Sequence, residues 1–200
     1  MERSFEAVLV EQCAPTLAGV KPASLFRYQG ADKRQSREAA ARWAKELAPY
    51  GITVRVLKFC PQTGACLIYL YRAGWLRSIL TEPSNRAFLA RQGYQADQDW
   101  PDLLRQLARR LCLEREFPHE IGVFLGYPLE DVAGFVKNKG KNYLYSGYWK
   151  VYKNAENAKR LFALYRAARE EAEKLALEGK GLWEMIRRFS LGRELSTAVH

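Results

Sequence analysis

The fold is decided by ITVRVLKF at residues 52–59 and ACLIYLYR at residues 65–72, which PQTG at residues 61–64 separates. In the first segment, apolar side chains alternate with Thr53 and Arg55, as in a strand with one buried face. The second segment is rich in β-branched and aromatic residues, and the connection contains proline and glycine. We therefore expect an antiparallel β-hairpin. In its first strand, Ile52, Val54 and Val56 are expected on one face, a series that Lys58 extends, and Thr53, Arg55 and Leu57 on the other.

Helical periodicity dominates the chain on both sides of this hairpin. Asp32 opens a capping-box pattern, and a helix is expected from there to Pro49. Residues 23–28 favour a strand, and residues 3–12 favour a short helix that ends ahead of Pro15, because proline interrupts helical hydrogen bonding. Further helical patterns cover residues 73–80, 83–92, 99–114 and 154–176.

Two later segments are less clearly defined. Residues 119–127 fit a helix or a buried strand equally well, because their apolar positions match both periods. Pro128 is expected to open a short helix, and alternating tyrosines and lysines predict a strand pair that turns at Ser146 and Gly147. Cys112 is expected in the core, on the apolar face of the helix over residues 99–114.

These elements predict an α+β protein with a small, mostly antiparallel sheet, several packed helices and a long C-terminal helix. A chain of 200 residues can bury roughly 70% of its unfolded surface, so it can fold without a metal or a disulfide. We find no repeat and no linker-like segment. One domain is therefore expected over residues 1–190, followed by a flexible tail over residues 191–200.

Targeting and metal-binding patterns are missing from the sequence. No apolar run is long enough for a membrane span, and no secretory leader is recognisable, so we expect a cytoplasmic protein with reduced cysteines. His119 and Glu120 do not form a zinc-protease motif, because Val123 stands where the second histidine belongs. No metal site is predicted. Cys60 and Cys66 lie at the two ends of the hairpin connection, either as a redox pair or as small buried residues.

The most distinctive chemical feature is the stretch Lys137–Lys153, with five lysines, five aromatic residues and no acidic residue. Lysines neutralise phosphates and aromatic rings stack on bases or flat cofactors. A hairpin with one packed face gives the same alternation, so a purely structural role is the alternative. The candidate ligand-binding residues are Lys139, Lys141, Tyr148, Trp149 and Lys150.

Three side chains are candidates for catalysis. His119 can act as a general acid or base near neutral pH, and Glu120 is its neighbour, although adjacent residues point in different directions. Cys13 lies where the first helix is expected to break, a place that can present a thiol to a cleft. For each of them, a structural role is the competing interpretation.

Three strings carry a resemblance to a bacterial family catalogued as a domain of unknown function. They are CAPTLAGVKPASLF at residues 13–26, HEIGVFLGYPLEDVAGFV at residues 119–136 and GYWKVY at residues 147–152. The resemblance covers roughly residues 5–170 and implies a bacterial cytoplasmic protein. It implies no activity, cofactor or catalytic residue.

Charge and motifs together leave three functional hypotheses. The net charge of +10 favours anionic partners. The first hypothesis is a cytoplasmic protein, either a binding protein or an enzyme, for an anionic small molecule or cofactor of unknown identity, with a cleft that contains Cys13, His119 and the Lys139–Trp149 stretch. The second is a nucleic-acid-binding module that uses the same lysines and aromatic residues together with Arg105, Arg109 and Arg110. The third is an adaptor for an acidic protein partner.

Overall fold

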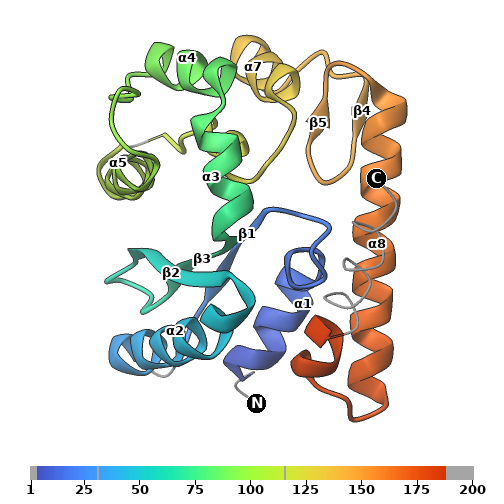
Figure 1. The fold of residues 1–200 in the computed structure, drawn as a ribbon. Helices are drawn as coiled ribbons and strands as arrows, with labels where there is room; N and C mark the ends of the chain where they lie inside the picture. Colours follow the sequence, from blue (N-terminus) through green and yellow to red (C-terminus); the bar gives the residue numbers. More distant parts are fainter. Residues whose placement is uncertain (1–3, 31, 115, 188–200) are drawn as a thin grey trace. The chain divides into compact units, whose positions relative to one another are not determined.

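The computed structural model describes residues 4–30, 32–114 and 116–187 (Figure 1). It confirms the predicted α+β class, with small antiparallel sheets, many helices and a long C-terminal helix. The chain divides into two compact units, Met1–Arg72 with Ala163–His200 (unit 1) and Ala73–Phe162 (unit 2). One domain over residues 1–190 stays a prediction, and the expected tail over residues 191–200 lies outside the described residues.

Unit 1 contains the predicted hairpin within a three-stranded sheet. Strands β1 (Ala23–Tyr28), β2 (Ile52–Phe59) and β3 (Cys66–Arg72) are antiparallel in the order β1-β3-β2. The expected alternation of β2 fails beyond Val56, because a β-bulge at Leu57 shifts the register and pairs Lys58 with Leu67. A bulge inserts one unpaired residue, so a strict period of two cannot continue through it.

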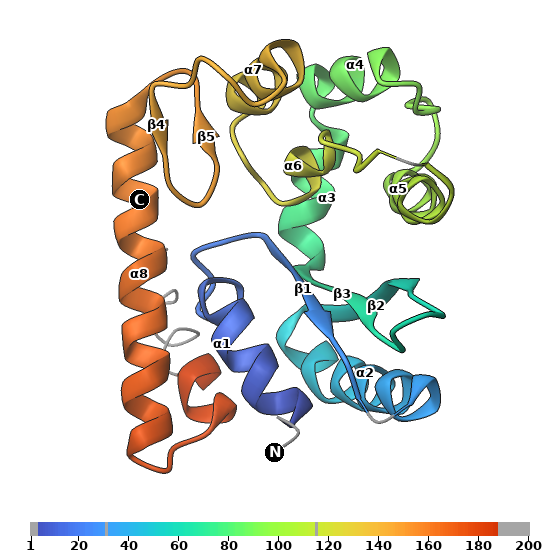
Figure 2. The same ribbon diagram turned by 180° about the vertical axis from the view of Figure 1, so that it is seen from behind.

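Helices cover one face of this sheet. They are α1 (Phe5–Leu17) and α2 (Lys33–Leu47), which is followed by the short turn η1 (Ala48–Tyr50). The unit 1 part of α8 (Ala155–Leu177) lies beside α1 and adds to the same core (Figures 1 and 2). Asp32 caps α2 as predicted, because its carboxylate accepts the Gln35 N–H at 2.7 Å. The shared core contains Leu9, Leu17, Trp43, Leu47, Ile52, Ile68, Leu70, Ala172 and Leu175.

Helix α1 corrects the predicted break at Pro15. The helix continues through this proline to Leu17. Proline lacks an N–H, so near a helix end it removes one hydrogen bond without reversing the chain. The carbonyls that follow are satisfied from the sheet, because the Arg72 guanidinium donates to Thr16 O at 2.8 Å and to Leu17 O at 2.7 Å. The positive charge of Arg72 also interacts favourably with the partial negative charge at the C-terminus of α1.

Unit 2 is mainly helical. Its first three helices, α3 (Ala73–Thr81), α4 (Pro83–Arg91) and α5 (Trp100–Leu113), agree with the predicted segments. Cys112 is exposed and not in the core, because the buried face of α5 consists of its leucines and residue 112 is turned roughly 100° from Leu111. Residues 119–127 form the short helix α6 (Ile121–Phe124) and a turn, not a strand.

The rest of unit 2 is α7 (Leu129–Asn138), a small hairpin of β4 (Tyr145–Ser146) and β5 (Lys150–Val151), and the start of α8. The predicted strand pair exists, but residues 147–149 form its connection, because Ser146 pairs with Lys150. Asn154, where the predicted C-terminal helical pattern begins, caps α8, with its side-chain oxygen accepting the Asn157 N–H at 3.2 Å. Within the described part of the chain, no helix has both the length and the apolar character that a membrane crossing requires.

Candidate functional site

A pocket in unit 2 brings together several residues that the sequence singled out. It has a volume of about 370 Å³, and His119, Tyr148, Trp149 and Lys150 all line it. They come from two segments about thirty residues apart in the sequence, one on each side of α7. The predicted grouping of the His119 segment with the Lys/aromatic stretch is therefore present within this unit.

Close packing around two glycines shapes this pocket. A Cβ at Gly122 would lie 2.7 Å from Val132 Cγ2, so α6 approaches α7 only because this side chain is missing. A Cβ at Gly147 would lie 2.2 Å from Phe162 Cε2, so the hairpin connection packs directly on the Phe162 ring. Both glycines line the pocket. Steric contacts alone therefore explain why glycine occupies position 122 in the string at residues 119–136 and position 147 in the string at residues 147–152.

Aromatic rings form much of the pocket wall. Tyr127 and Trp149 are stacked with ring centroids 4.8 Å apart, and His119 lies 4.8 Å from Phe135. Phe117 extends this edge and is 49% exposed, although its sequence gave no functional signal. Burial raises the pKa of the Tyr127 phenol to about 12, so this hydroxyl stays neutral at physiological pH. The wall therefore offers flat, uncharged surface to a ligand.

Asp131 holds the hairpin against this wall. Its side chain is 2% exposed, and it accepts hydrogen bonds from Trp149 Nε1 at 2.7 Å and from the backbone N–H groups of Tyr152 and Lys153 at 2.8 and 3.0 Å. Three donors replace the hydration that a buried carboxylate loses. Asp131 therefore fixes the Trp149 ring and the return strand, and its charge is already compensated.

Lys150 is the one lysine in the pocket lining. Its Nζ donates to Gly140 O at 2.6 Å and lies 4.8 Å from the Tyr143 ring centroid. An ammonium group has three protons, so this hydrogen bond leaves donor capacity for an anion. Lys139 and Lys141 are exposed on the loop that flanks Gly140, and neither lines the pocket. The predicted lysines therefore divide into one at the pocket and two beside it.

Glu120 takes no part in this pocket. Its carboxylate is buried and accepts from Tyr94 Oη at 3.0 Å, and Arg110 Nη1 lies 3.4 Å away. Glu120 raises the pKa of Tyr94 further after burial, the larger cause. Its hydrogen bond with Tyr94, in the loop between α4 and α5, and its ion pair with Arg110 of α5 explain why adjacency to His119 in the sequence does not place it against the imidazole. His119 itself is exposed at the pocket edge.

Cys13 belongs to unit 1 and is fully buried inside α1. The expectation that it lies at a helix break is wrong, since α1 continues past it. Burial raises the pKa of its thiol to about 12, and a protonated, inaccessible thiol is a poor nucleophile. We therefore leave Cys13 out of the candidate site.

Cys60 and Cys66 are both free thiols at the hairpin connection. Cys66 is paired across the sheet with Phe59, and Cys60 Sγ donates to Gln62 Oε1 at 3.2 Å. A redox role for this pair stays a prediction. Among the described residues, no group of three or more His, Cys, Asp or Glu side chains is arranged to hold a metal ion.

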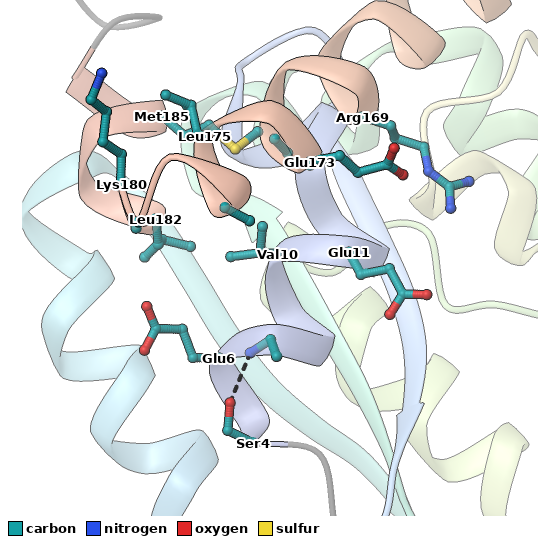
Figure 3. Close-up of a pocket in the computed structure, with 16 residues that line it drawn as sticks. Ser4, Glu6, Val10, Glu11, Arg169, Glu173, Leu175, Lys180, Leu182 and Met185 are labelled. Atoms are coloured by element: carbon teal, nitrogen blue, oxygen red, sulfur yellow. Dashed lines mark hydrogen bonds between the residues drawn. The ribbon is translucent and has the colours of Figure 1, made fainter.

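A larger groove of about 590 Å³ lies in unit 1 (Figure 3). Val10, Leu175, Leu182 and Met185 supply its larger apolar side chains, from α1, α8 and the helical residues 182–187 that follow α8. The charged residues that line it are Glu6, Glu11, Glu173, Arg169 and Lys180. None of the predicted site residues contributes to it, and carboxylates outnumber cations in a protein of net charge +10.

A family model described as "Protein of unknown function (DUF3793)" matches residues 9–186. The chain belongs to this family. All three of the strings that carried the resemblance lie within the matched residues. Neither a curated protein nor a solved structure matches the chain. Family membership therefore assigns no activity to the pocket, and its chemistry has to be argued from its side chains.

The sequence did not point to the residues that hold or form the aromatic wall of the pocket. Asp131 lies in the first turn of α7, and its contacts lie 18 to 22 residues away in the sequence, so no local pattern indicates them. The signal for Asp131 and Tyr127 is their place within the family string at residues 119–136. Phe117 lies outside that string and gives no signal beyond its aromatic character.

Proposed function

We propose that this protein binds an anionic small molecule or cofactor with a flat ring in the unit 2 pocket. The observation that carries the proposal is the convergence of His119, Tyr148 and Lys150 on one aromatic-walled pocket. Its volume of about 370 Å³ is in the range of small-molecule sites, which are mostly apolar with a few converging polar groups.

The flat part of the ligand would lie against the aromatic wall. Tyr127 and Trp149 already stack on each other, and the Asp131 hydrogen bond fixes the indole, so the surface needs little ordering when a ligand binds. Tyr148 is half-buried at the same pocket and packs against Phe162 with centroids 5.5 Å apart. A preorganised aromatic surface favours ring systems over flexible aliphatic acids.

The anionic part would meet Lys150 and His119. Asp131 is the carboxylate in the lining, and its three hydrogen-bond donors compensate its charge, so it does not oppose a bound anion strongly. Any proton transfer would involve His119, since Glu120 is engaged with Tyr94 and Arg110. We propose binding as the function, and a reaction can be assigned only when the ligand has been identified.

The adaptor hypothesis has less support. An acidic partner would contact the arginine-rich helices, but on α5 Arg105 pairs with Asp102, and Arg110 contacts both Glu114 and Glu120. Arg110 also donates to Gln92 O at 2.5 Å. These intramolecular contacts offset the charge that a partner would need to recognise.

Native mass spectrometry and absorption spectroscopy of the purified protein test the proposal first. We expect a bound mass or a ligand absorption band that is lost on denaturation. The protein would then be titrated with flavin mononucleotide, adenosine monophosphate and inorganic phosphate, followed by thermal shift and tryptophan fluorescence.

Lys150→Met is expected to weaken binding of the ring-bearing anions at least tenfold, because it removes the cation at the pocket. Lys153→Met is the matched control, since Lys153 is exposed, lies outside this pocket and pairs with Glu130 at 3.8 Å. Equal affinity of the two variants would contradict the proposed site.

A further inference from the structure

We infer that the ring in the unit 2 pocket is an unstacked base of a single-stranded nucleic acid, whose backbone continues along the loop Lys137–Tyr143. This inference rests on the proposed function, because the base would occupy the same pocket. It names the ligand as a polymer and adds a second contact surface, which we call the lysine loop and define as residues 137–143.

The lysine loop adjoins the pocket directly. Gly140, at its centre, accepts a hydrogen bond from Lys150 Nζ at 2.6 Å, and a Cβ on Gly140 would lie 3.0 Å from the Phe135 ring. Lys150 and Phe135 both line the pocket. Lys139 and Lys141 therefore stand on either side of a residue that touches the pocket edge, yet neither side chain is part of the lining.

The charges of this loop are not compensated locally. Between Asp131 and Glu156 the sequence has five lysines and no acidic residue. Lys153 pairs with Glu130, just outside this interval. Among the described residues, no ion pair involves Lys137, Lys139 or Lys141, and Lys137, Lys139 and Lys141 are exposed. Three exposed ammonium groups in five residues are suited to successive phosphates of one strand.

Exposed aromatic rings continue from the same loop. Tyr143 and Tyr145 are 44% and 37% exposed. Lys150 Nζ is positioned over the Tyr143 ring and Lys159 Nζ over the Tyr145 ring, at 4.8 and 5.9 Å from their centroids. Exposed rings interleaved with cations are the usual surface for single strands, because every base has a face that can stack.

The division of the lysines argues for a polymer over a mononucleotide. A pocket of about 370 Å³ holds little more than one base and its sugar, and it contains one lysine. A single nucleotide bound there has no charge to place against three lysines outside the lining, whereas a strand has several. A duplex is disfavoured, because its bases are stacked and cannot enter a pocket.

Fluorescence anisotropy with labelled oligo-dT and oligo-U tests the inference. A mononucleotide, a tetranucleotide and an octanucleotide would be compared between about 50 and 200 mM salt. We expect affinity to increase with length, and the slope of log affinity against log salt to lie near −0.7 for each phosphate bound. The preferred series identifies the sugar, and a preference for duplex DNA over both would overturn the inference.

Two sets of variants separate the loop from the pocket. Lys139→Gln with Lys141→Gln is expected to lower octanucleotide affinity at least tenfold and to reduce the salt slope by about 0.7 for each lysine, while mononucleotide binding is retained. Tyr148→Ala is expected to lower affinity about tenfold with the salt slope unchanged. Lys45→Gln with Lys174→Gln, both exposed in unit 1, is the charge-matched control and should bind as wild type does.

Failure of this inference is distinguishable from failure of the proposed function. If a mononucleotide binds as tightly as the octanucleotide and the lysine variants bind normally, the polymer is wrong and the small-molecule pocket stands. If oligonucleotides bind but Tyr148→Ala has no effect, the base does not occupy the pocket and the inference is wrong. If no nucleotide binds at any length, the inference is also wrong, and the masses found by native mass spectrometry decide the proposed function.

Discussion

The unit 1 groove and the unit 2 pocket differ in almost every property except that both are cavities. The groove is larger, about 590 Å³ against about 370 Å³, and it combines aliphatic side chains with three carboxylates (Figure 3). The pocket is walled by aromatic rings and contains a histidine and a lysine. In a protein of net charge +10, only the pocket has the chemistry that the whole chain's charge favours.

The contrast teaches that volume alone does not choose a site. A groove between helices forms wherever small side chains such as Ala7, Ala14 and Ala176 leave space, and it needs no further organisation. The pocket depends on a buried carboxylate and on two glycines that no alanine could replace without movement. Side chains that are held in place by such contacts are what a binding site requires.

Asp131→Ala is the strongest way to break this comparison, because it removes the organisation of the pocket. Three donors would lose a charged acceptor, and two of them are backbone N–H groups that cannot turn away. We expect a loss of about 3 to 5 kcal/mol in the free energy of unfolding, measured by urea denaturation. Glu130→Ala removes a neighbouring exposed carboxylate and is expected to cost less than about 1 kcal/mol. Similar losses for the two variants would contradict the role of Asp131.

In unit 1, the buried ionisable group Lys21 responds to burial with a lowered pKa, whereas buried Asp131 in unit 2 accepts three hydrogen bonds. The substitution Lys21→Met tests this difference. Burial lowers the Lys21 pKa from 10.5 to about 8. The unfolded chain then binds this proton more tightly than the folded chain, so stability is expected to increase as pH rises from about 8 to 10.5. The full change is on the order of 3 kcal/mol, and Lys21→Met should abolish it in urea unfolding curves.

Cys13 has to be controlled in that experiment. Its pKa is raised from 9.0 to about 12, so stability attributable to this thiol decreases as pH rises through that interval. The Lys21 comparison is therefore made in a Cys13→Ala background, where the increase from pH 8 should be seen alone. An unchanged increase in the Lys21→Met, Cys13→Ala chain would exclude Lys21 as its source.

A pair of alanine substitutions compares the packing of the two cavities. Gly147→Ala places a methyl group 2.2 Å from Phe162 Cε2, and overpacking of this kind costs about 1 to 3 kcal/mol. Gly181→Ala lies at the groove, where the nearest atom is Glu6 Oε1 at 3.6 Å, and we expect no loss or a gain of about 0.5 kcal/mol. Thermal melts of both variants would show the difference, and equal melting temperatures would refute it.

The smallest effect is expected from a control substitution in the unit 1 groove. Glu173→Gln changes the charge of the groove, yet ligand affinity in the pocket should stay within about twofold of wild type and stability within about 0.5 kcal/mol. Titration with the ligand found for unit 2 measures the first quantity. A larger change in affinity would show that the groove, and not the pocket alone, takes part in binding.

The sequence predicted local structure better than proximity. The hairpin of β2 and β3, the Asp32 cap and the Asn154 cap follow from residue patterns that act over a few positions. The predicted break at Pro15 was wrong, because tertiary contacts such as those of Arg72 stabilise the last turn of α1. The predicted core position of Cys112 was wrong for a local reason, because residue 112 lies roughly 100° around α5 from Leu111 on the buried leucine face.

For the candidate site, the two segments were recognisable by their chemistry, and their meeting was a hypothesis that no local pattern required. His119 and Lys150 were recognisable by residue type, and both line the pocket. The segment that contains Lys150 is held in place by Asp131 on α7, whose hydrogen-bond partners lie 18 to 22 residues later in the sequence. Hydrogen bonds over such separations leave no periodic trace in one sequence. The distinction between a lysine that lines the pocket and lysines beside it likewise needed the course of the loop at Gly140.

The hairpin of β4 and β5 has a consequence for the order in which unit 2 folds. Its strands have two residues each, too few to persist alone in water. It is held by Asp131 in the first turn of α7 and by the packing of Gly147 on Phe162 of α8. We therefore expect the hairpin, and with it the Trp149 side of the pocket wall, to become ordered together with these two helices and not before them.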